Sequence, residues 1–395
     1  MSTEIPPRAW VEVRGSALLR NLETVRAAAG PSTRLITMVK ANGYGLGVGP
    51  LIRILENEPL WGYGVASVEE GRELRELGVR CPVLVFSPVP PGAEAAAVAA
   101  GLTLCLSDVE ALERLDAAAR SAGTVVTAHL EIDTGMGRAG FPDGVIDRWR
   151  PRVAELTVGS GEASRGSDEG AGGVRLGGVF THYHSADAFD GAAGASIEAQ
   201  QRRFARVLVS LEGLLSADAF VHLSNSAGIL RGPRGGASVA EAGVRPGIFL
   251  YGGRAGEALP DPEPVVAIRA RVIRVARVPA GATQGYGSTY RADGEERWAT
   301  LAIGYGDGLP RALSNRGSVL LHGHEAPIVG RISMDVTVVD ITGLPSTRPG
   351  DLATIVGRDG DRERTLDAVA HEAGTISYEI LTGLSRRLPR VWLPD

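Results

Sequence analysis

Short apolar runs alternate with amphipathic stretches over residues 34–245, and this rhythm constrains the fold of the chain most. The runs have the length and composition of buried strands, and most are separated by segments with helical spacing of apolar residues. They begin near Arg34, Gly62, Val83, Leu102, Val125, Arg175, Ala219 and Glu241. Eight strands alternating with helices predict a (β/α)8 barrel, with a doubly wound sheet as the alternative.

Four amphipathic segments are predicted as helices of this domain. The first has Ser16 as its N-cap and ends at Gly30. The other three span Val68–Leu77, Asp108–Ala122 and Ile197–Leu215. Between the fifth and sixth strands, Gly159–Gly173 is polar and glycine-rich, which predicts a surface loop to which we assign no function.

A stretch rich in proline and glycine, GRAGEALPDPEP, ends the alternation, and short β-rich runs follow it. In this second part only Leu366–Leu381 is expected to be helical, with Thr365 as its N-cap. The sequence therefore predicts a barrel over residues 1–254 and a mostly β domain over residues 255–395. The first strand, residues 8–14, could pair with that second domain.

Charge and composition indicate a small-molecule partner. The net charge is -5 with acids and bases mixed along the chain, so no basic stripe for nucleic acid is expected. No apolar run is long enough for a membrane span, and the start MSTEIPPRAW lacks the apolar stretch of a signal peptide. Cys81 and Cys105 have no metal or redox spacing and the seven histidines form no zinc-type cluster, so a cytoplasmic protein without a metal site is expected.

Lys40 is the strongest candidate for chemistry. It is predicted as the last residue of the first barrel strand in RLITMVKANGYGLG, where three glycines then interrupt regular structure. An amine flanked by apolar residues loses hydration of its charged form, so its pKa should fall and Schiff-base chemistry becomes possible. The alternative is a lysine at a strand end with its head in water.

The barrel hypothesis can be compared with the residues that end the other strands, because barrel active sites lie at the C-terminal ends of strands. Arg138 follows the fifth strand and His182 follows the sixth. The seventh and eighth strands end in small hydroxyls, an amide, an arginine and a glycine backbone, namely Ser224, Asn225, Ser226, Arg245, Gly247 and Ile248. Such groups can hold a phosphate. A phosphorylated cofactor with an aldehyde for Lys40 would be pyridoxal phosphate.

Nine motifs spread over the chain resemble the alanine racemase family in order and approximate spacing. They are VKANGYGLG, HLEIDTGMGRAG, FTHYHSAD, NSAG, VRPGI, QGYGSTY, AIGYGDG, VGRISMD and TISYE. The resemblance implies a pyridoxal phosphate barrel followed by a β domain. It also implies a homodimer in which each active site borrows residues from the partner's β domain.

The resemblance also implies residue roles. Lys40 matches the Schiff-base lysine and one catalytic base, and Tyr286 matches the second base, supplied by the partner subunit. The positions that match phosphate-binding or nearby cofactor residues are Tyr44, Ser226, Gly247, Ile248 and Tyr378. His182 matches a residue near the pyridine ring of the cofactor, and Arg245 matches the partner of the ring nitrogen. Arg138 matches a residue that contacts the cofactor and the substrate carboxylate. Tyr305 and Met334 match residues of the substrate entrance and carboxylate site, which are again supplied by the partner subunit.

These roles make chemical sense. Racemisation removes a proton from one face and returns one to the other, so one base on each side is economical. Arg245 cannot act as an acid, so a pyridine nitrogen facing it accepts a hydrogen bond without becoming protonated. The ring is then a weaker electron sink, which disfavours transamination and decarboxylation.

Two positions depart from the family pattern. Glu131 stands where many members have a lysine that carries a carbamate, and its own negative charge could hold Arg138, directly or through a water. Leu46 stands where the family often has histidine, so one hydrogen bond is missing or replaced.

The sequence thus predicts an enzyme that interconverts L- and D-alanine and supplies D-alanine for a bacterial cell wall. A serine or broad-specificity racemase and a decarboxylase are alternatives within the same architecture. A pyridoxal phosphate carrier without turnover is an alternative of another class, although it would have no use for Tyr286.

Overall fold

The computed structural model describes residues 6–157, 172–188, 191–232 and 239–394. Among these residues, eight parallel strands close into a barrel, with β5 pairing to β6 at the closure. The barrel strands are β2 (Arg34–Met38), β3 (Gly62–Val65), β4 (Val83–Val85), β5 (Thr103–Leu106), β6 (Val125–Asp133), β8 (Gly173–Phe180), β9 (Leu215–Asn225) and β10 (Gly243–Arg245). The closed sheet confirms the barrel and excludes the doubly wound alternative.

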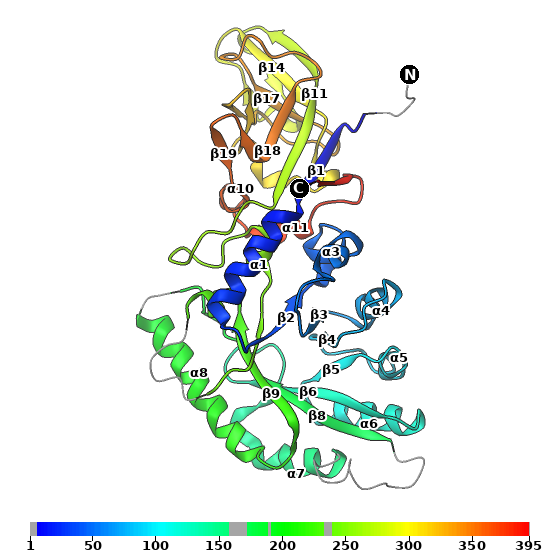
Figure 1. The fold of residues 1–395 in the computed structure, drawn as a ribbon. Helices are drawn as coiled ribbons and strands as arrows, with labels where there is room; N and C mark the ends of the chain where they lie inside the picture. The colour runs from blue at the N-terminus through cyan, green and yellow to red at the C-terminus, as the bar shows by residue number, and fades with distance from the viewer. Residues whose placement is uncertain (1–5, 158–171, 189–190, 233–238, 395) are drawn as a thin grey trace.

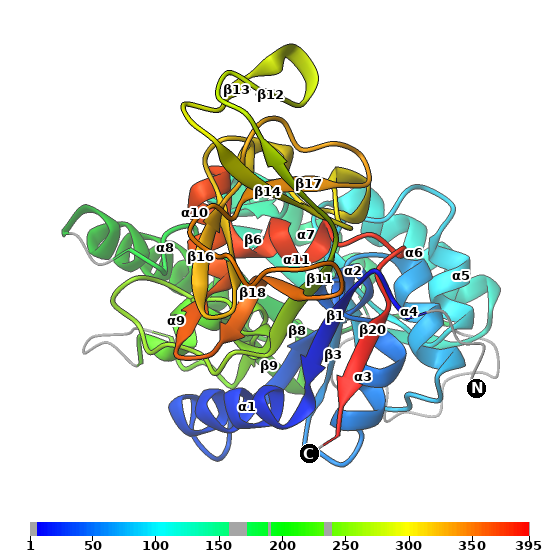
Figure 2. The same ribbon diagram turned by 90° about the horizontal axis from the view of Figure 1, so that it is seen from above.

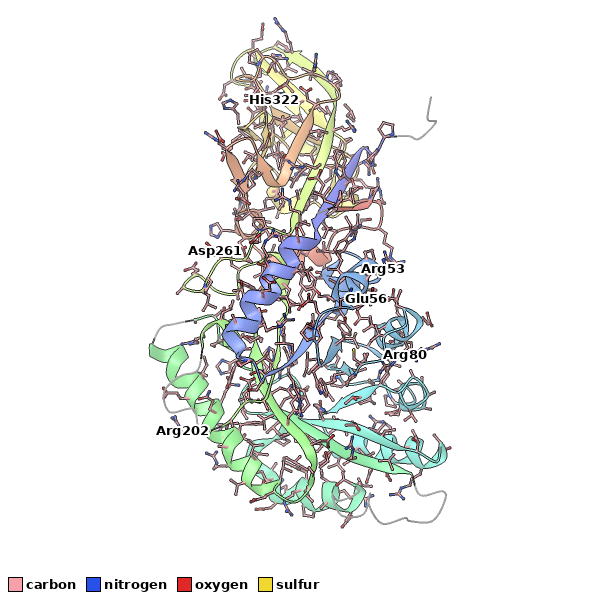
Figure 3. The ribbon with its side chains drawn as sticks, viewed as in Figure 1. Arg53, Glu56, Arg80, Arg202, Asp261 and His322 are labelled. Atoms are coloured by element: carbon pink, nitrogen blue, oxygen red, sulfur yellow. The ribbon has the colours of Figure 1, made fainter. Side chains whose placement is uncertain are left out.

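Helices surround this barrel (Figure 1). They are α1 (Gly15–Ala29), α3 (Val48–Leu55), α4 (Val68–Glu76), α5 (Glu94–Ala99), α6 (Val109–Ser121), α7 (Ile146–Leu156), α8 (Gly191–Ser210) and α9 (Ser226–Leu230). Charged side chains such as Arg53 of α3 and Arg202 of α8 project outward from this layer (Figure 3). The opposite side of each helix packs on strands that are buried on both faces, which is why those strands consist of nearly continuous apolar residues.

The barrel interior is filled by a separate cluster of side chains from alternate positions of the strands. Its members are Ile36, Leu84, Cys105, Phe180 and Phe220, with Trp61 and Phe86 packed against them. The barrel is therefore a packed core, and a reactive group must lie at its rim.

The second domain contains, among the described residues, a nine-stranded sheet. Its strands are β1 (Ala9–Arg14), β11 (Val266–Val278), β14 (Glu296–Leu301), β15 (Ser318–Leu321), β16 (His324–Pro327), β17 (Thr337–Asp340), β18 (Leu352–Asp359), β19 (Arg362–Arg364) and β20 (Arg390–Leu393). The N-terminal strand β1 pairs antiparallel with β11 and parallel with β20. Both ends of the chain are thus tied into the domain that lies over the barrel in Figure 2.

Shorter elements complete this domain. They are the hairpin β12 (Thr283–Gln284) and β13 (Tyr290–Arg291), the 3-10 turns η3 (Tyr286–Ser288), η4 (Tyr305–Asp307) and η5 (Arg311–Leu313), and the helices α10 (Leu366–Ala373) and α11 (Ser377–Thr382). Seen from above, the β12–β13 hairpin projects beyond the domain body (Figure 2).

Several predicted boundaries were wrong. Ser16 is not the N-cap of α1, because Arg14 holds that position without a side-chain hydrogen bond. The helix predicted over Ile197–Leu215 is α8, which starts and ends earlier, and β9 begins at Leu215. The single helix over Leu366–Leu381 is two helices, because Gly374 ends α10 in a left-handed conformation. Thr365 does cap α10, with its hydroxyl accepting a hydrogen bond from Ala368. Nearly all of the loop predicted over Gly159–Gly173 lies outside the described residues.

Candidate active site

Lys40 lies at the rim of the barrel, but it does not end a strand as the sequence predicted. Strand β2 ends at Met38, and Lys40 begins the short element α2 (Lys40–Tyr44). Within it Ala41, Asn42, Gly43 and Tyr44 have φ between 53° and 62°, a left-handed turn that is costly for residues with a Cβ.

Hydrogen bonds hold this strained turn in place. The Glu70 carboxylate accepts from the backbone N–H of Ala41 and of Ala66, both at 2.7 Å. The Asn42 Oδ1 accepts from the N–H of Val48 at 2.8 Å. Because the surrounding structure determines the turn this strongly, the position of the Lys40 Cα is fixed.

The environment of Lys40 lowers the pKa of its amine. Desolvation by surrounding protein atoms is the main cause, and the positive charge of Arg138 adds to it, while Glu70 acts in the opposite direction. The side chain itself remains accessible at the barrel rim. An accessible amine with a lowered pKa is the form that a nucleophile or a general base requires.

Arg138 and His182 come from the neighbouring rim loops. The Asp133 Oδ1 accepts hydrogen bonds from the N–H groups of Gly135 and Gly137, at 2.9 and 3.1 Å, and so shapes the loop that presents Arg138. Burial, followed by the charges of Arg245, Arg138 and Lys40, lowers the pKa of His182 to about 3. His182 is therefore a neutral imidazole near neutral pH.

Arg245, at the end of β10, is buried and hydrogen-bonded through both of its terminal nitrogens. Its Nη1 donates to Nδ1 and the carbonyl of His222, at 2.6 and 2.7 Å. Its Nη2 donates to the carbonyls of Thr181 and Leu223, at 2.9 and 2.8 Å, and faces Nδ1 of His182 at 3.3 Å. Its Nε makes no hydrogen bond among the described residues. Burial lowers the pKa of Arg245 to about 10, so the guanidinium stays charged at neutral pH.

Two hydroxyls and a tight backbone turn form a polar cradle beside Arg245. The Ser226 Oγ accepts from the N–H of Gly247 at 2.8 Å. A Cβ on Gly247 would lie 2.4 Å from the Tyr44 Oη, so this approach requires glycine. The N–H of Ile248, at the start of η2 (Ile248–Tyr251), has no acceptor among the described residues. The two hydroxyls and the free N–H surround a space that the absent side chain of Gly247 leaves open, and such a group of donors can hold a small anion.

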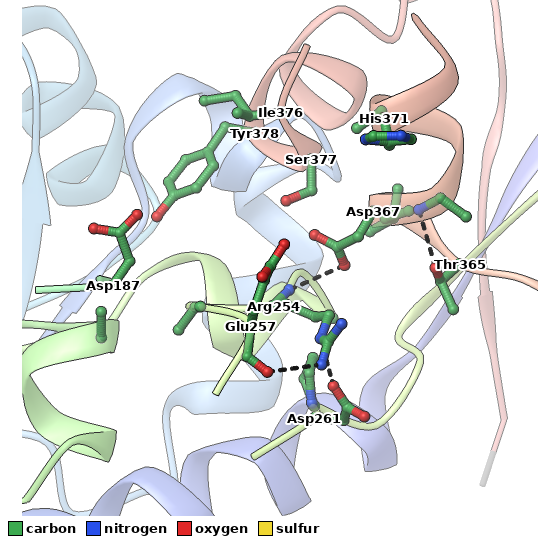
Figure 4. Close-up of a pocket in the computed structure, with 18 of the residues that line it drawn as sticks. Asp187, Arg254, Glu257, Asp261, Thr365, Asp367, His371, Ile376, Ser377 and Tyr378 are labelled. Carbon is green, nitrogen blue, oxygen red and sulfur yellow. Dashed lines mark hydrogen bonds and ion pairs between the residues drawn. The ribbon is translucent and has the colours of Figure 1, made fainter. Parts of the chain in front are cut away.

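Above the rim lies a cavity of about 1460 Å³ between the barrel and the β domain (Figure 4). Arg138, His182, Asn225 and Tyr378 line it. The Tyr378 ring lies 6.2 Å from that of Tyr44, and burial together with Asp187 and Asp367 raises the pKa of Tyr378 to about 12. Asn225 caps α9 by accepting from the N–H of Gly228, so its Oδ1 is already engaged.

Glu131 and Leu46, the two departures from the family pattern, are both buried. The Glu131 Oε2 accepts from the Ser107 hydroxyl at 3.3 Å, and no ion pair within 4.0 Å joins it to Arg138 in the described part of the chain. Desolvation raises the pKa of Glu131 in spite of the opposing charges of Arg138 and Arg245. Leu46 is fully buried in the main core, where it acts by packing.

Three of the four predicted site residues of the second domain, Tyr286, Tyr305 and Met334, do not line this cavity in a single chain, whereas the fourth, Tyr378, does. Tyr286, Tyr305 and Met334 are 71%, 42% and 52% exposed. No hydrogen bond, ion pair or ring contact joins any of them to Lys40 within the described ranges. They are displayed on the surface of the second domain.

Three residues that the sequence analysis did not single out support the site. His222 and His129 lie behind Arg245 inside the barrel, and Glu70 holds the turn after Lys40. The sequence signal that could have indicated the two histidines is a histidine at an inward-facing position of a strand, namely His222 in FVHLSN and His129 in AHLEID.

Comparisons with known proteins agree along the whole chain. The family model described as "Alanine racemase, N-terminal domain" matches residues 13–255, and that described as "Alanine racemase, C-terminal domain" matches residues 265–392. The alanine racemase of Syntrophobacter fumaroxidans is 34% identical over 381 residues, covering 96% of each chain. The solved alanine racemase of Streptomyces lavendulae is 32% identical with a TM-score of 0.87, covering 99% of this chain and 98% of that one. The Bacillus anthracis alanine racemase with bound L-Ala-P is 29% identical with a TM-score of 0.85, covering 100% and 97%.

Proposed function

This chain belongs to the alanine racemase family, and on that premise we propose that it interconverts L- and D-alanine with Lys40 and Tyr286 of the partner subunit as two opposed bases. The observation that carries the proposal is the grouping of an accessible amine of lowered pKa, a buried arginine and an anion cradle at one rim of the barrel. The family uses pyridoxal phosphate, and we extend that cofactor to this chain.

The residues present fit this cofactor. The cradle of Tyr44, Ser226 and the Gly247–Ile248 backbone suits a phosphate, because the Cβ of any other residue at position 247 would fill the space. Arg245 offers a nitrogen without an acceptor to the ring nitrogen. His182, Asn225 and Tyr378 line the adjoining cavity. When bound, pyridoxal phosphate supplies an aldehyde for an amine and a ring that draws electrons from the α-carbon.

Lys40 acts in two ways in this proposal. Its amine is the group that would hold the cofactor through the aldehyde, and once displaced by the substrate amine it would move a proton on one face of the α-carbon. Arg138, which is exposed at the same rim and whose charge lowers the pKa of Lys40, is suited to hold the substrate carboxylate. Tyr286 moves the proton on the opposite face.

Arg245 determines the type of reaction. Its guanidinium stays charged at neutral pH and can only donate, so it does not protonate the group it faces. We propose that this restraint favours proton return over decarboxylation or transamination.

A homodimer completes the site. Tyr286, Tyr305 and Met334 are exposed in one chain, which supports their use by the partner subunit. We propose the division into residues 1–254 and 255–395 on the same basis, with the second part reaching across. No helix in the described part of the chain is both long and apolar enough to cross a membrane. We propose a cytoplasmic enzyme whose D-alanine product enters peptidoglycan.

The direct test is the loss of optical activity of L-alanine with purified protein and added pyridoxal phosphate, with L-serine and L-lysine in parallel. Rapid decay with alanine alone is expected. Faster decay with another amino acid would change the substrate and keep the reaction class. Cofactor absorbance without decay of any substrate would contradict the proposal and favour a carrier.

A further inference from the structure

Asp307 is a buried carboxylate that no role above explains. It lies in η4 with none of its surface exposed. Its Oδ1 pairs with Arg8 Nη2 at 2.5 Å and with Arg387 Nε at 3.3 Å, and its Oδ2 accepts from the N–H of Gly304 at 3.0 Å. A charge is buried this fully only when it is paired, so these contacts determine its position.

The two arginines also bind the loop that carries Met334. Arg8 Nη1 donates to the carbonyl of Asp335 at 3.1 Å, and Arg387 Nη2 donates to the Asp335 Oδ1 at 2.6 Å. Arg8 precedes β1 and Arg387 precedes β20, so both ends of the chain meet at this carboxylate.

Backbone hydrogen bonds join the same two segments. The N–H of Tyr305 donates to the carbonyl of Ser333 at 3.0 Å, and that of Gly306 donates to Met334 at 2.8 Å. A Cβ on Gly304 would lie 2.3 Å from the Ser333 carbonyl oxygen, which shows how closely the segments approach. Tyr305 and Met334 are therefore displayed together, as one unit with Asp307 beneath them.

The geometry points to Asp307 as a positioning residue for the active site of the partner subunit, acting through Tyr305 and Met334. This inference rests on the proposed function, in which those two side chains enter the neighbouring site. Asp307 itself touches neither substrate nor cofactor. It holds η4 against the Met334 loop and so fixes the positions of the Tyr305 and Met334 side chains relative to each other.

The Asp307→Asn variant keeps the size of the side chain and removes its charge. We expect kcat/KM for alanine to fall about 100-fold, chiefly through KM, because misplacement of about 1 Å costs that much. Asp351→Asn is the matched control, since Asp351 is another ion-paired carboxylate of the β domain. It should change kcat/KM by less than about threefold. A wild-type rate for Asp307→Asn would overturn the inference. If that variant does not fold, Arg387→Gln replaces it with the same expectations.

Hybrid dimers separate a role in the partner's site from a role within the same chain. Asp307→Asn and Lys40→Ala chains are co-expressed with different tags, and the doubly tagged dimers are isolated. One of their two sites then combines Lys40 of one chain with Asp307 of the other, so about half of the wild-type kcat/KM should return. A Tyr286→Phe and Lys40→Ala hybrid is the parallel control for shared sites.

The two hybrids fail in distinguishable ways. Recovery in the Tyr286 hybrid without recovery in the Asp307 hybrid would overturn the positioning role and leave the proposed function intact. Failure of both would contradict the shared active site itself, and with it the inference that rests on it. Recovery in both supports Asp307 as a positioning residue that acts across the dimer.

Discussion

Arg245 Nη1 lies 2.6 Å from Nδ1 of His222, and because an arginine only donates, this histidine nitrogen must accept. Burial and the charge of Arg245 lower the pKa of His222 well below its usual value, so its imidazole is neutral and its hydrogen is on Nε2. That atom lies 2.9 Å from Nδ1 of His129, which must accept in turn. The two histidines form an ordered chain behind the arginine.

We predict that His222→Ala impairs catalysis more than His129→Ala does. Both variants should lose about 3 kcal/mol of unfolding free energy, since each deletes a buried hydrogen bond and leaves a cavity. Only His222→Ala removes a side-chain hydrogen-bond partner of Arg245, so its kcat should fall at least about tenfold while that of His129→Ala stays within about threefold. Steady-state kinetics and urea unfolding measure both. Equal losses of kcat would show that stability alone accounts for the effect.

Stability should fall in mild acid. Burial lowers the pKa of His129 and of His182 to about 3, and that of His222 also lies well below its usual value. The unfolded chain, whose histidines have pKa values near ~6.5, therefore binds these protons first. The stability that the neutral histidines contribute is fully present above pH ~6.5. It is lost as the pH falls toward 3, at up to ~1.4 kcal/mol per pH unit for each histidine.

Glu131 changes the stability in the opposite direction, because its pKa is raised and the stability that it contributes is lost as the pH rises. It is a single group, whereas three histidines act in the other direction. Urea unfolding at pH 7.5, 6 and 5 measures the sum. Unchanged unfolding free energy over that range would contradict the neutral histidines.

Gly247→Ala should weaken cofactor binding and leave the fold intact. The new Cβ would lie 2.4 Å from the Tyr44 Oη, so the cradle must open. Overpacking of this kind costs about 1 to 3 kcal/mol, which corresponds to a dissociation constant for pyridoxal phosphate about 5 to 150 times higher. An absorbance titration measures it. Gly294→Ala is the control, since nothing lies within 4 Å of its added Cβ.

Activity should not depend on bicarbonate. Glu131 already supplies a negative charge where many family members carry a carbamate, and its contact to Ser107 at 3.3 Å places it within the barrel. Initial rates in buffer freed of carbon dioxide and in buffer with added bicarbonate should agree. A reproducible increase on adding bicarbonate would count against Glu131 as a substitute.

The barrel was predictable because its strands are buried on both faces and appear as short apolar runs. Element ends were less predictable, because they depend on tertiary contacts. Lys40 shows this, since β2 ends two residues before it, at Met38, and the left-handed turn that begins after Lys40 is held by Glu70 from a later helix. The link between His222 and His129 joins residues 93 positions apart, and no local pattern indicates such a contact.

Candidate site residues on the rim were predictable from the strand ends, and the resemblance supplied those on the β domain. The position of Tyr286 relative to Lys40 depends on a second copy of the chain. The proposed roles of these two residues therefore form the central claim that needs a measurement.

Exchange of the α-hydrogen in deuterated water tests that claim most directly. With the wild-type enzyme, L- and D-alanine should both exchange and interconvert. With Tyr286→Phe, interconversion should stop while exchange continues for one enantiomer only, because Lys40 still serves one face. Equal loss of exchange for both enantiomers, or continued interconversion, would contradict two opposed bases.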